Sequence, residues 1–266
     1  MSGFKKIIPC LACLQLLLAV ESVHALEIEV VTEATPFTIL EPDRAEVGGE
    51  ATEFVSQVLD RAGVKYEIRY APWKRAYRKA LNVKNVLVYP IAKTEEREDS
   101  FHWVGKLTPV RYYLFGLRER SDIKLSNLDS VRNYSLGVVN KHAHHEYLNA
   151  HGFNEVELVN SSAQNLRKLL LGRIDLFPLS SSGLPPLCED IAVDCSKVVP
   201  KLKLDDFSDG LYMAFSKGSD PAVIEAVNNA YQDAIQEPAY QSILELRENS
   251  ATLIEQQYQE LRSSTN

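Results

Sequence analysis

A threonine and an arginine follow directly on a short apolar run, and this spacing suits the binding of an anionic group. Residues 87–92 form the apolar run, and the chain turns polar at Lys93, so that Thr94 and Arg97 lie just beyond a predicted strand. Ligands of open α/β sheets bind at that end of the strands. An arginine there holds a carboxylate through two parallel hydrogen bonds, a geometry that lysine cannot reproduce. The alternative is an arginine in a solvated charge run, whose acidic members are Glu95, Glu96, Glu98 and Asp99.

Several histidines crowd one stretch and raise the question of a metal site. They are His142, His144, His145 and His151. Neutral imidazoles are common ligands of transition metals, but His144 and His145 cannot both lie on one face of a helix. We therefore favour solvated or helix-start histidines, and we expect neither a metal nor another cofactor. If these side chains line a cleft, their protonation could tune its affinity for anions.

Side chains suited to catalysis are few. Glu33 and His142 are the candidates for an acid or a base, and neither has a partner that the sequence can place. The sequence shows no nucleophile elbow, phosphate loop or metalloprotease motif. Aromatic side chains could wall a pocket or pack in the core, and for Tyr77 we favour the core. The others are Phe37, Trp73, Tyr89 and Trp103.

Charge and hydropathy argue against several classes of function. A formal net charge of −7 argues against nucleic acid or an anionic membrane surface as the partner. Lys5 and Lys6, the apolar run after them and small residues up to Ala25 are typical of a signal peptide cleaved after Ala25, residues 1–25. We therefore expect export to the periplasm. No later segment has the roughly 18 uninterrupted apolar residues of a spanning helix, which disfavours the sensory domain of a membrane receptor.

Two cysteines remain beyond the predicted signal peptide. Cys188 and Cys195 bracket a short acidic segment. In an oxidising compartment they are expected to form a disulfide that pins a surface loop and contributes roughly 2–3 kcal/mol. A metal site would need more ligands nearby, and a redox pair would be spaced more closely.

The rest of the chain alternates strand-like and helical segments, which is typical of α/β architecture. Strands with helices between them predict parallel pairing in the first part, and a second such series follows residue 110. We predict two lobes joined by two extended crossings, with a ligand cleft between the lobes. The segments are strands at 27–31, 66–70, 87–92 and 211–216, and helices at 51–62, after Pro72, at 143–150, from 161 or 162, from Pro221 and beyond 249.

A series of short motifs resembles the family 3 bacterial extracellular solute-binding proteins, the periplasmic receptors of polar amino acid ABC transporters. The resemblance covers nearly the whole chain after residue 25 and implies a type II periplasmic-binding fold. It implies one lobe from 26–108 and 210–266 and another from 109–209. The motifs are Gly49 to Glu53, Pro72-Trp73, Thr94 to Arg97, Gly137-Val138-Val139, Gly172 to Asp175 and Tyr212 to Ser216.

The resemblance also implies roles for individual residues. The arginine of the family's T-x-x-R motif grips the ligand's α-carboxylate, and this residue is Arg97 here. Backbone N–H groups at the start of a second-lobe helix bind the same carboxylate in the family. The matching positions are Asn140, Lys141, His142 and Ala143.

The chain departs from the family pattern in three places. Tyr89, Pro90 and Ala92 stand where hydroxyls are usual before the arginine, and Lys141-His142 replaces the usual Gly-Thr or Gly-Ser. Ser180 stands where an aspartate takes the ligand's ammonium group. Glu33 could substitute for that aspartate, and a carboxylate ligand without an amine is equally compatible.

The resulting functional prediction is a periplasmic receptor that performs no chemistry. It captures a small carboxylate-bearing solute, an amino acid or a related molecule, as a monomer and delivers it to an ABC permease. The alternative is a periplasmic enzyme on the same fold, such as a dehydratase of cyclic carboxylates.

Overall fold

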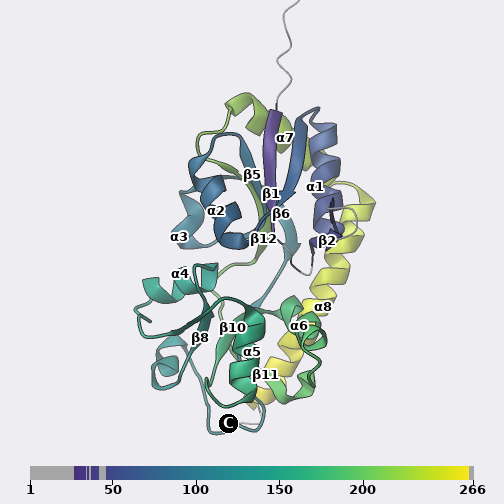
Figure 1. Cartoon of the computed structure of the whole chain (residues 1–266). Helices are drawn as coiled ribbons and strands as arrows, with labels where there is room; N and C mark the ends of the chain where they lie inside the picture. The colour runs from purple at the N-terminus through teal and green to yellow at the C-terminus, as the bar shows by residue number, and fades with distance from the viewer. Residues whose placement is uncertain (1–26, 34, 36, 42–45, 264–266) are drawn as a thin grey trace, which may run out of the picture.

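The protein consists of two lobes stacked along one axis (Figure 1). The computed structural model describes residues 27–33, 35, 37–41 and 46–263. The predicted signal peptide and its cleavage after Ala25 lie outside these residues. Among the described residues, no helix is both long enough and apolar enough to cross a membrane.

Lobe one is built on a five-stranded sheet in the order β4-β1-β5-β12-β6. Strand β1 pairs in parallel with β4 and with β5, as predicted, whereas β12 runs antiparallel to β5 and β6. Every residue of β5 is buried, as expected for a central strand that is covered on both faces. The strands are β1 (Glu27–Thr32), β4 (Lys65–Tyr70), β5 (Val86–Ala92), β6 (Phe101–Pro109) and β12 (Gly210–Ser216), and a small hairpin adds β2 (Ile39–Glu41) and β3 (Glu46–Gly48).

The structure contains the lobe-one helices predicted at 51–62, after Pro72 and from Pro221, and it adds a short helix at 95–98 that was not predicted. Gly63 follows the first helix with a φ of 64°, the left-handed conformation that glycine adopts without strain. The carboxylate of Asp220 accepts a hydrogen bond from the N–H of Ala222 at 2.9 Å and caps the helix that begins at Pro221. The helices are α1 (Glu50–Arg61), α2 (Trp73–Asn82), α3 (Glu95–Glu98) and α7 (Pro221–Ala234).

Lobe two has a three-stranded sheet, β10-β7-β11, and a parallel pair, β8-β9. A bridge between Leu136 and Leu176 brings the pair beside the larger sheet. The strands are β7 (Tyr112–Leu117), β8 (Gly137–Val139), β9 (Glu157–Val159), β10 (Phe177–Ser180) and β11 (Val198–Lys203). The helices are α4 (Ala143–Ala150), α5 (Ser162–Leu170) and α6 (Leu184–Asp190), with single-turn or short 3-10 helices η1 (Leu128–Asn133), η2 (Ser181–Gly183) and η3 (Cys195–Lys197).

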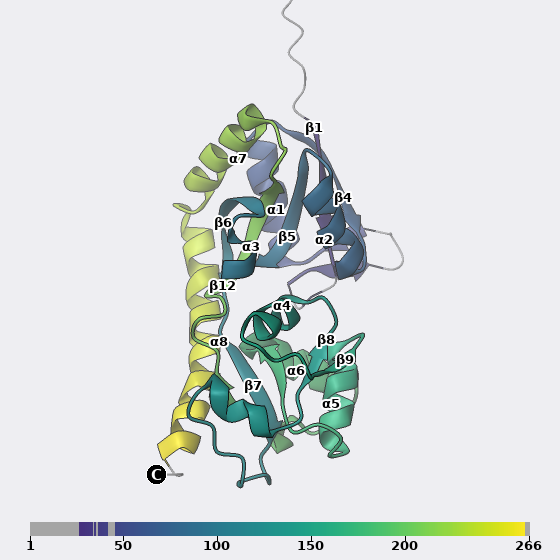
Figure 2. The same cartoon turned by 90° about the vertical axis from the view of Figure 1, so that its left-hand side faces the viewer.

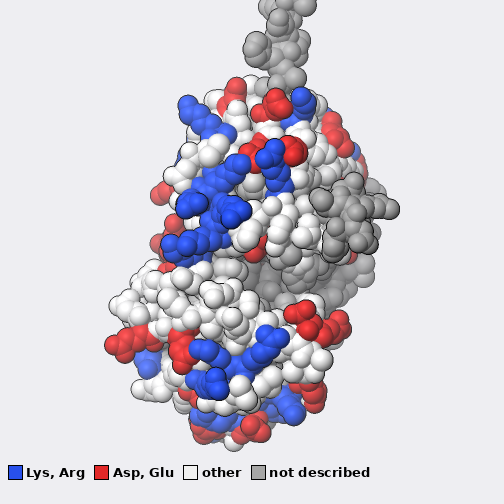
Figure 3. Space-filling view, viewed as in Figure 1, with Lys and Arg blue, Asp and Glu red and all other residues white. Residues whose placement is uncertain are grey.

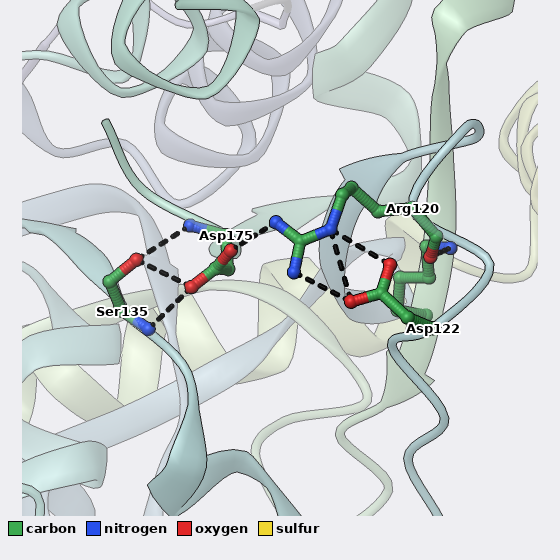
Figure 4. A network of polar contacts seen from close by, with 5 residues as sticks. Arg120, Asp122, Ser135 and Asp175 are labelled. Carbon is green, nitrogen blue, oxygen red and sulfur yellow. Dashed lines mark hydrogen bonds and ion pairs between the residues drawn. The ribbon is translucent and has the colours of Figure 1, made fainter. Parts of the chain in front are cut away.

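Asp175, the aspartate of the Gly172 to Asp175 motif, joins distant parts of lobe two (Figure 4). One of its oxygens accepts from the backbone N–H of Ser135 at 2.9 Å and from its hydroxyl at 2.7 Å. The other accepts from Arg120 at 2.6 Å, and Arg120 also pairs with Asp122. The motif therefore has a structural role: it holds the loop after β7 against the segment that leads to β8.

Helix α8 (Pro238–Ser263) runs along both lobes (Figure 2). Tyr240 stacks on Phe54 of lobe one, with ring centroids 4.5 Å apart, and donates a hydrogen bond to the carbonyl of Lys106 at 2.6 Å. Tyr258, at the other end, packs against Tyr113 of lobe two at 5.6 Å. We expected residues 210–266 to belong to lobe one. Helix α8 contacts both lobes, because Tyr240 packs on lobe one and Tyr258 packs on lobe two.

The negative net charge is not spread evenly over the surface. Figure 3 shows basic side chains gathered on lobe one over α2. Lys74, Arg75 and Arg78 are the exposed basic residues of this helix. Trp73, Ala76 and Ala80 form its buried stripe, so the basic residues occupy the opposite, solvent-facing side.

Candidate functional site

A cavity of about 590 Å³ lies between the two lobes. Its wall is mainly apolar, with a few polar and charged groups, which is the usual composition of a small-molecule site. Lobe one contributes Glu33, Thr35, Phe37, Trp73, Pro90, Ala92, Arg97 and Leu211. The other lining residues are Tyr112, Val139, His142, Ala143, His144, Ser162, Pro178, Leu179, Ser180, Gly183, Pro186, Leu187, Asp190 and Phe207.

Arg97 is the one arginine or lysine among the described residues that line this cavity. It lies on α3, directly after the buried strand β5, and its exposed fraction is only 1%. Its guanidinium carbon lies 4.5 Å from the ring centroid of Tyr77 and 5.3 Å from that of Trp73. Aromatic faces attract a cation at such distances. The two rings of α2 therefore hold the guanidinium group in place at the wall of the cavity.

Glu146 of lobe two is the ion-pair partner of Arg97. The Nε of Arg97 donates to Oε2 of Glu146 at 2.8 Å, and 28% of the glutamate side chain is exposed. Glu146 lies in the first turn of α4, which faces α3 across the cleft. The pair therefore joins the two lobes.

Some polar atoms at or near the cavity are buried without a hydrogen-bond partner among the described residues. Nη2 of Arg97 is one, and the others are Nε1 of Trp73, Oγ1 of Thr94 and Nε2 of His144. A buried donor without an acceptor costs roughly 1–3 kcal/mol, and more when it is charged. A ligand that supplies an acceptor to Arg97 would remove that cost.

Glu33 is a carboxyl group at the same cavity. Burial raises its pKa from 4.5 to about 7, although the positive charge of Arg97 opposes the shift. The carboxyl therefore titrates near neutral pH. It can accept a hydrogen bond or an ammonium group when ionised, and donate a proton when neutral.

The clustered histidines have separate structural roles. His142 lies at the N-cap position of α4, and burial followed by the charge of Arg97 lowers its pKa to about 4. His144 stacks on Phe207 at 4.5 Å, and burial lowers its pKa to about 3. His145 accepts the N–H of Lys141, and His151 contacts Tyr147. Within the described part of the chain, no group of His, Cys, Asp or Glu could hold a metal ion.

Most residues predicted for the ligand site lie on the wall of the cavity. They come from several strand ends and helix starts in two lobes, and the fold brings them together. These residues are Glu33, Phe37, Trp73, Pro90, Ala92, Arg97, His142, Ala143 and Ser180.

The remaining predicted site residues lie elsewhere. Tyr89 is fully buried in the core of lobe one and donates to the hydroxyl of Thr52 at 3.0 Å. Its side chain leaves β5 on the face opposite to that of Pro90, so it does not line the cavity. Thr94 is buried at the N-cap position of α3. Asn140 and Lys141 are exposed.

The predicted donors at the start of α4 are already bonded within the protein. The N–H of Asn140 binds the carbonyl of Val159 at 2.9 Å, and that of His142 binds the carbonyl of Val139 at 3.2 Å. The N–H of Lys141 binds Nδ1 of His145 at 3.0 Å. These three amides are therefore not presented to a ligand as the family resemblance implied.

Sequence reasoning missed several residues of the site. Tyr77, which we expected in the core, packs partly there and also holds the guanidinium of Arg97. Tyr112, His144 and Phe207 form a ring cluster on the lobe-two wall. Glu146 had one available signal: it is an acidic residue in the first turn of a helix predicted to begin at the cleft.

The predicted disulfide is confirmed. Cys188 of α6 is bonded to Cys195 of η3, with their Cα atoms 5.6 Å apart. Helix α6 also carries Pro186, Leu187 and Asp190 on the cavity wall. The disulfide thus fixes the C-terminal end of a helix that closes one side of the site.

Comparison with known proteins identifies the fold. No family model matches the sequence, and no curated protein matches it. Among solved structures, a histidine kinase sensor domain with similarity to periplasmic binding proteins has a TM-score of 0.70 at 17% identity, over 84% of this chain and 96% of that one.

Two further structures show the same arrangement. The arginine-, lysine-, histidine-binding protein ArtJ from Geobacillus stearothermophilus has a TM-score of 0.65 at 17% identity, over 83% of this chain and 94% of that one. An ancestral amino acid-binding protein, a precursor of cyclohexadienyl dehydratase, has a TM-score of 0.63 at 17% identity, over 83% and 94%. The chain therefore has the two-lobed α/β fold of the periplasmic binding proteins, as the sequence predicted.

Proposed function

We propose that this protein is an exported, periplasmic solute-binding protein for an ABC permease. Its ligand is a small carboxylate-bearing molecule, an amino acid or a relative of one. The observation that carries the proposal is the buried arginine on the wall of the cavity, whose Nη2 has no partner among the described residues. A charged donor of this kind favours an anionic ligand group. Neighbours of the same fold that are named for binding amino acids support this ligand class.

Closure of the lobes couples binding to a change in shape. Arg97 holds one end of the ligand from lobe one, and His142, Ala143 and Phe207 contact it from lobe two. Contacts with both lobes exist only when the cleft is closed, so the ligand favours the closed form over the open one. A permease that recognises the closed form then receives loaded protein. Both walls of the cavity belong to one chain, so a monomer suffices.

A dehydratase-type enzyme is the second candidate, and the pKa of Glu33 favours it. A carboxyl group with a pKa of about 7 in a buried cleft is well matched to proton transfer at neutral pH. The similarity to a precursor of cyclohexadienyl dehydratase supports the same candidate. His142 and His144 are neutral at that pH and could donate or accept a hydrogen bond beside it.

A thermal-shift screen of amino acids, amines and organic acids tests the proposal. A ligand that binds only the native protein raises its melting temperature, and calorimetry then gives the affinity of each hit. We expect Arg97→Ala to weaken carboxylate binding at least tenfold and Arg97→Lys to weaken it nearly as much. Arg75→Ala, on the exposed face of α2, should leave the affinity unchanged. Unchanged affinity in Arg97→Ala rules out the carboxylate clamp. If mass spectrometry shows that the protein removes water from a hit, the result supports the dehydratase-type enzyme instead of the receptor.

A further inference from the structure

Glu146 places a carboxylate of the protein directly beside Arg97, in addition to the carboxyl group of Glu33 on the cavity wall. The role inferred for Glu146 rests on the proposed function. Its Oε2 already accepts the Nε hydrogen of Arg97 at 2.8 Å. Arg97 is almost completely buried, and Glu146 is about three-quarters buried. The ion pair is therefore only partly exposed to solvent, and its charges act on anything bound beside it more strongly than they would in water.

The guanidinium group offers a ligand only the donors that Glu146 leaves unoccupied. The rings of Tyr77 and Trp73 fix its orientation, and Nη2 is the buried donor without a partner among the described residues. A ligand carboxylate that accepts from Nη2 must share one positive charge with the carboxylate of Glu146. Two negative charges then lie on either side of a single positive charge.

The remaining groups of the cavity do not supply a second positive charge. Arg97 is the only lysine or arginine among the described residues that line it. His142 and His144 are buried and neutral near pH 7, since their pKa values are lowered to about 4 and about 3. Glu33 and, at the exposed rim, Asp190 add further negative charge when ionised. A ligand that carries a carboxylate alone would leave the filled cavity with excess negative charge, which is costly in a buried site.

We propose that Glu146 is a specificity-determining residue, which neutralises Arg97 and so makes the site select carboxylates that also carry an amine over simple carboxylic acids. The ligand's ammonium group supplies the positive charge that offsets the ligand's own carboxylate. Glu33 is placed on the same cavity wall to receive this group. Without Glu146, the full positive charge of Arg97 would be available to the ligand. This charge would offset the negative charge of a simple carboxylate that carries no amine.

The lining also indicates the body of the ligand. Phe37, Trp73 and Leu187 are apolar, and Tyr112 and Phe207 present aromatic rings to the cavity. An apolar side group of moderate size can therefore be buried there with favourable free energy. The class is an amine-bearing carboxylate with an apolar side group, and it has simple matched analogues that lack the amine.

Two such pairs test the proposal: L-phenylalanine with 3-phenylpropanoate, and L-leucine with 4-methylpentanoate. Isothermal titration of each compound into the wild-type protein, Glu146→Gln and Arg97→Ala gives the preference for the amine within each pair. We expect the wild type to prefer the amino acid at least tenfold. In Glu146→Gln this preference should fall at least tenfold, because the deaminated acid gains affinity. Glu155→Gln removes the same charge from an exposed position of lobe two and should leave the preference unchanged.

The outcomes separate this proposal from the proposed function. If Arg97→Ala abolishes binding and Glu146→Gln weakens both members of a pair equally, Glu146 only joins the lobes, and the specificity role is overturned while the receptor stands. If neither the wild type nor Glu146→Gln binds any of the four compounds, the specificity role is overturned, whereas the receptor proposal fails only when the thermal-shift screen also yields no carboxylate ligand. A wild type that prefers the deaminated acids overturns the specificity role alone.

Discussion

Burial makes individual groups in the cleft respond to pH in opposite directions. Glu33 has its pKa raised from 4.5 to about 7, so the native state binds more protons than the unfolded state between these values. Its contribution to stability is complete below pH 4.5 and is lost as the pH rises through about 7. His142 and His144 have pKa values lowered from 6.5, so their contribution is present above pH 6.5 and is lost as the pH falls.

Replacing Glu33 by glutamine should change the pH dependence of unfolding. Relative to Glu33→Gln, the wild type should lose roughly 1–2 kcal/mol of its free energy of unfolding between pH 5 and pH 8, since partial exposure screens the buried charge. Urea unfolding at several pH values measures this difference. Parallel profiles for the wild type and the variant would show that Glu33 is not buried in the folded protein.

His144→Phe tests the opposite pH dependence, in which the free energy of unfolding falls as the pH falls. The phenyl ring preserves the stack on Phe207 and cannot take up a proton. Between pH 6.5 and pH 4.5 the wild type should therefore lose more stability than the variant, by roughly 1 kcal/mol or more. Acid unfolding followed by circular dichroism measures both profiles. An equal loss in the two proteins would mean that His144 is not the group that is protonated.

At the scale of single elements, α8 determines how the lobes are held together. Near one end Tyr240 packs on Phe54 of lobe one, and near the other Tyr258 packs on Tyr113 of lobe two. Tyr258 is only 3% exposed, and its neighbour Glu255 accepts a hydrogen bond from Tyr113 at 2.7 Å. The helix therefore contributes to the stability of lobe two although most of the preceding chain, from β12 onward, lies in lobe one.

Truncation of Tyr258 should destabilise the protein. Tyr258→Ala removes a buried ring from the lobe-two core and should lower the free energy of unfolding by about 3 kcal/mol. Leu253→Ala on the same helix is the matched control, because this leucine is 67% exposed and should change stability by less than about 0.5 kcal/mol. Equal effects of the two substitutions would show that α8 does not pack on lobe two.

Elements with strong local signals could be predicted, and features that depend on contacts between distant segments could not. The parallel strands of lobe one and the Asp220-Pro221 helix start follow from local patterns and capping residues. The face of β5 could not be predicted, because all its residues are buried and no alternation distinguishes Tyr89 from Pro90. The continuous helix α8 was not predicted, because its course depends on packing against β6 of lobe one and β11 of lobe two. No local pattern in the sequence marks these contacts.

The same distinction applies to the candidate site. The position of Arg97 follows from the end of a strand, which the local sequence marks. Its pairing with Glu146, 49 residues further along the chain, depends on how the two lobes are placed. No pattern in either segment specifies that placement.

At the scale of the whole molecule, contacts across the cleft bias the lobes toward closure. The chain passes between the lobes at residues 110–111 and 204–209, and α8 accompanies these crossings. Across the cleft, Arg97 pairs with Glu146, and Trp73 meets His142 with ring centroids 6.2 Å apart. Both contacts belong to the closed arrangement of the lobes, so we expect them to favour this arrangement over an open one.

Loss of the cross-lobe ion pair should shift the protein toward the open arrangement. In Glu146→Gln the free protein should open more often, by a factor of about 5 for a partly exposed pair that contributes about 1 kcal/mol. Spin labels at exposed positions of α2 and of lobe two, such as Arg78 and Asn154, report the distance between the lobes. The distances should lengthen or broaden in Glu146→Gln and stay unchanged in Glu155→Gln. Identical distributions in all three proteins would mean that the pair does not influence closure.

The most direct test of the carboxylate clamp is a crystal structure of the protein with a hit from the ligand screen. We predict that the ligand lies in the cavity between the lobes with a carboxylate oxygen about 2.7–2.9 Å from Nη2 of Arg97, the distance of a charge-assisted hydrogen bond. A ligand bound outside this cavity, or one inside it whose carboxylate points away from Arg97, would contradict the clamp.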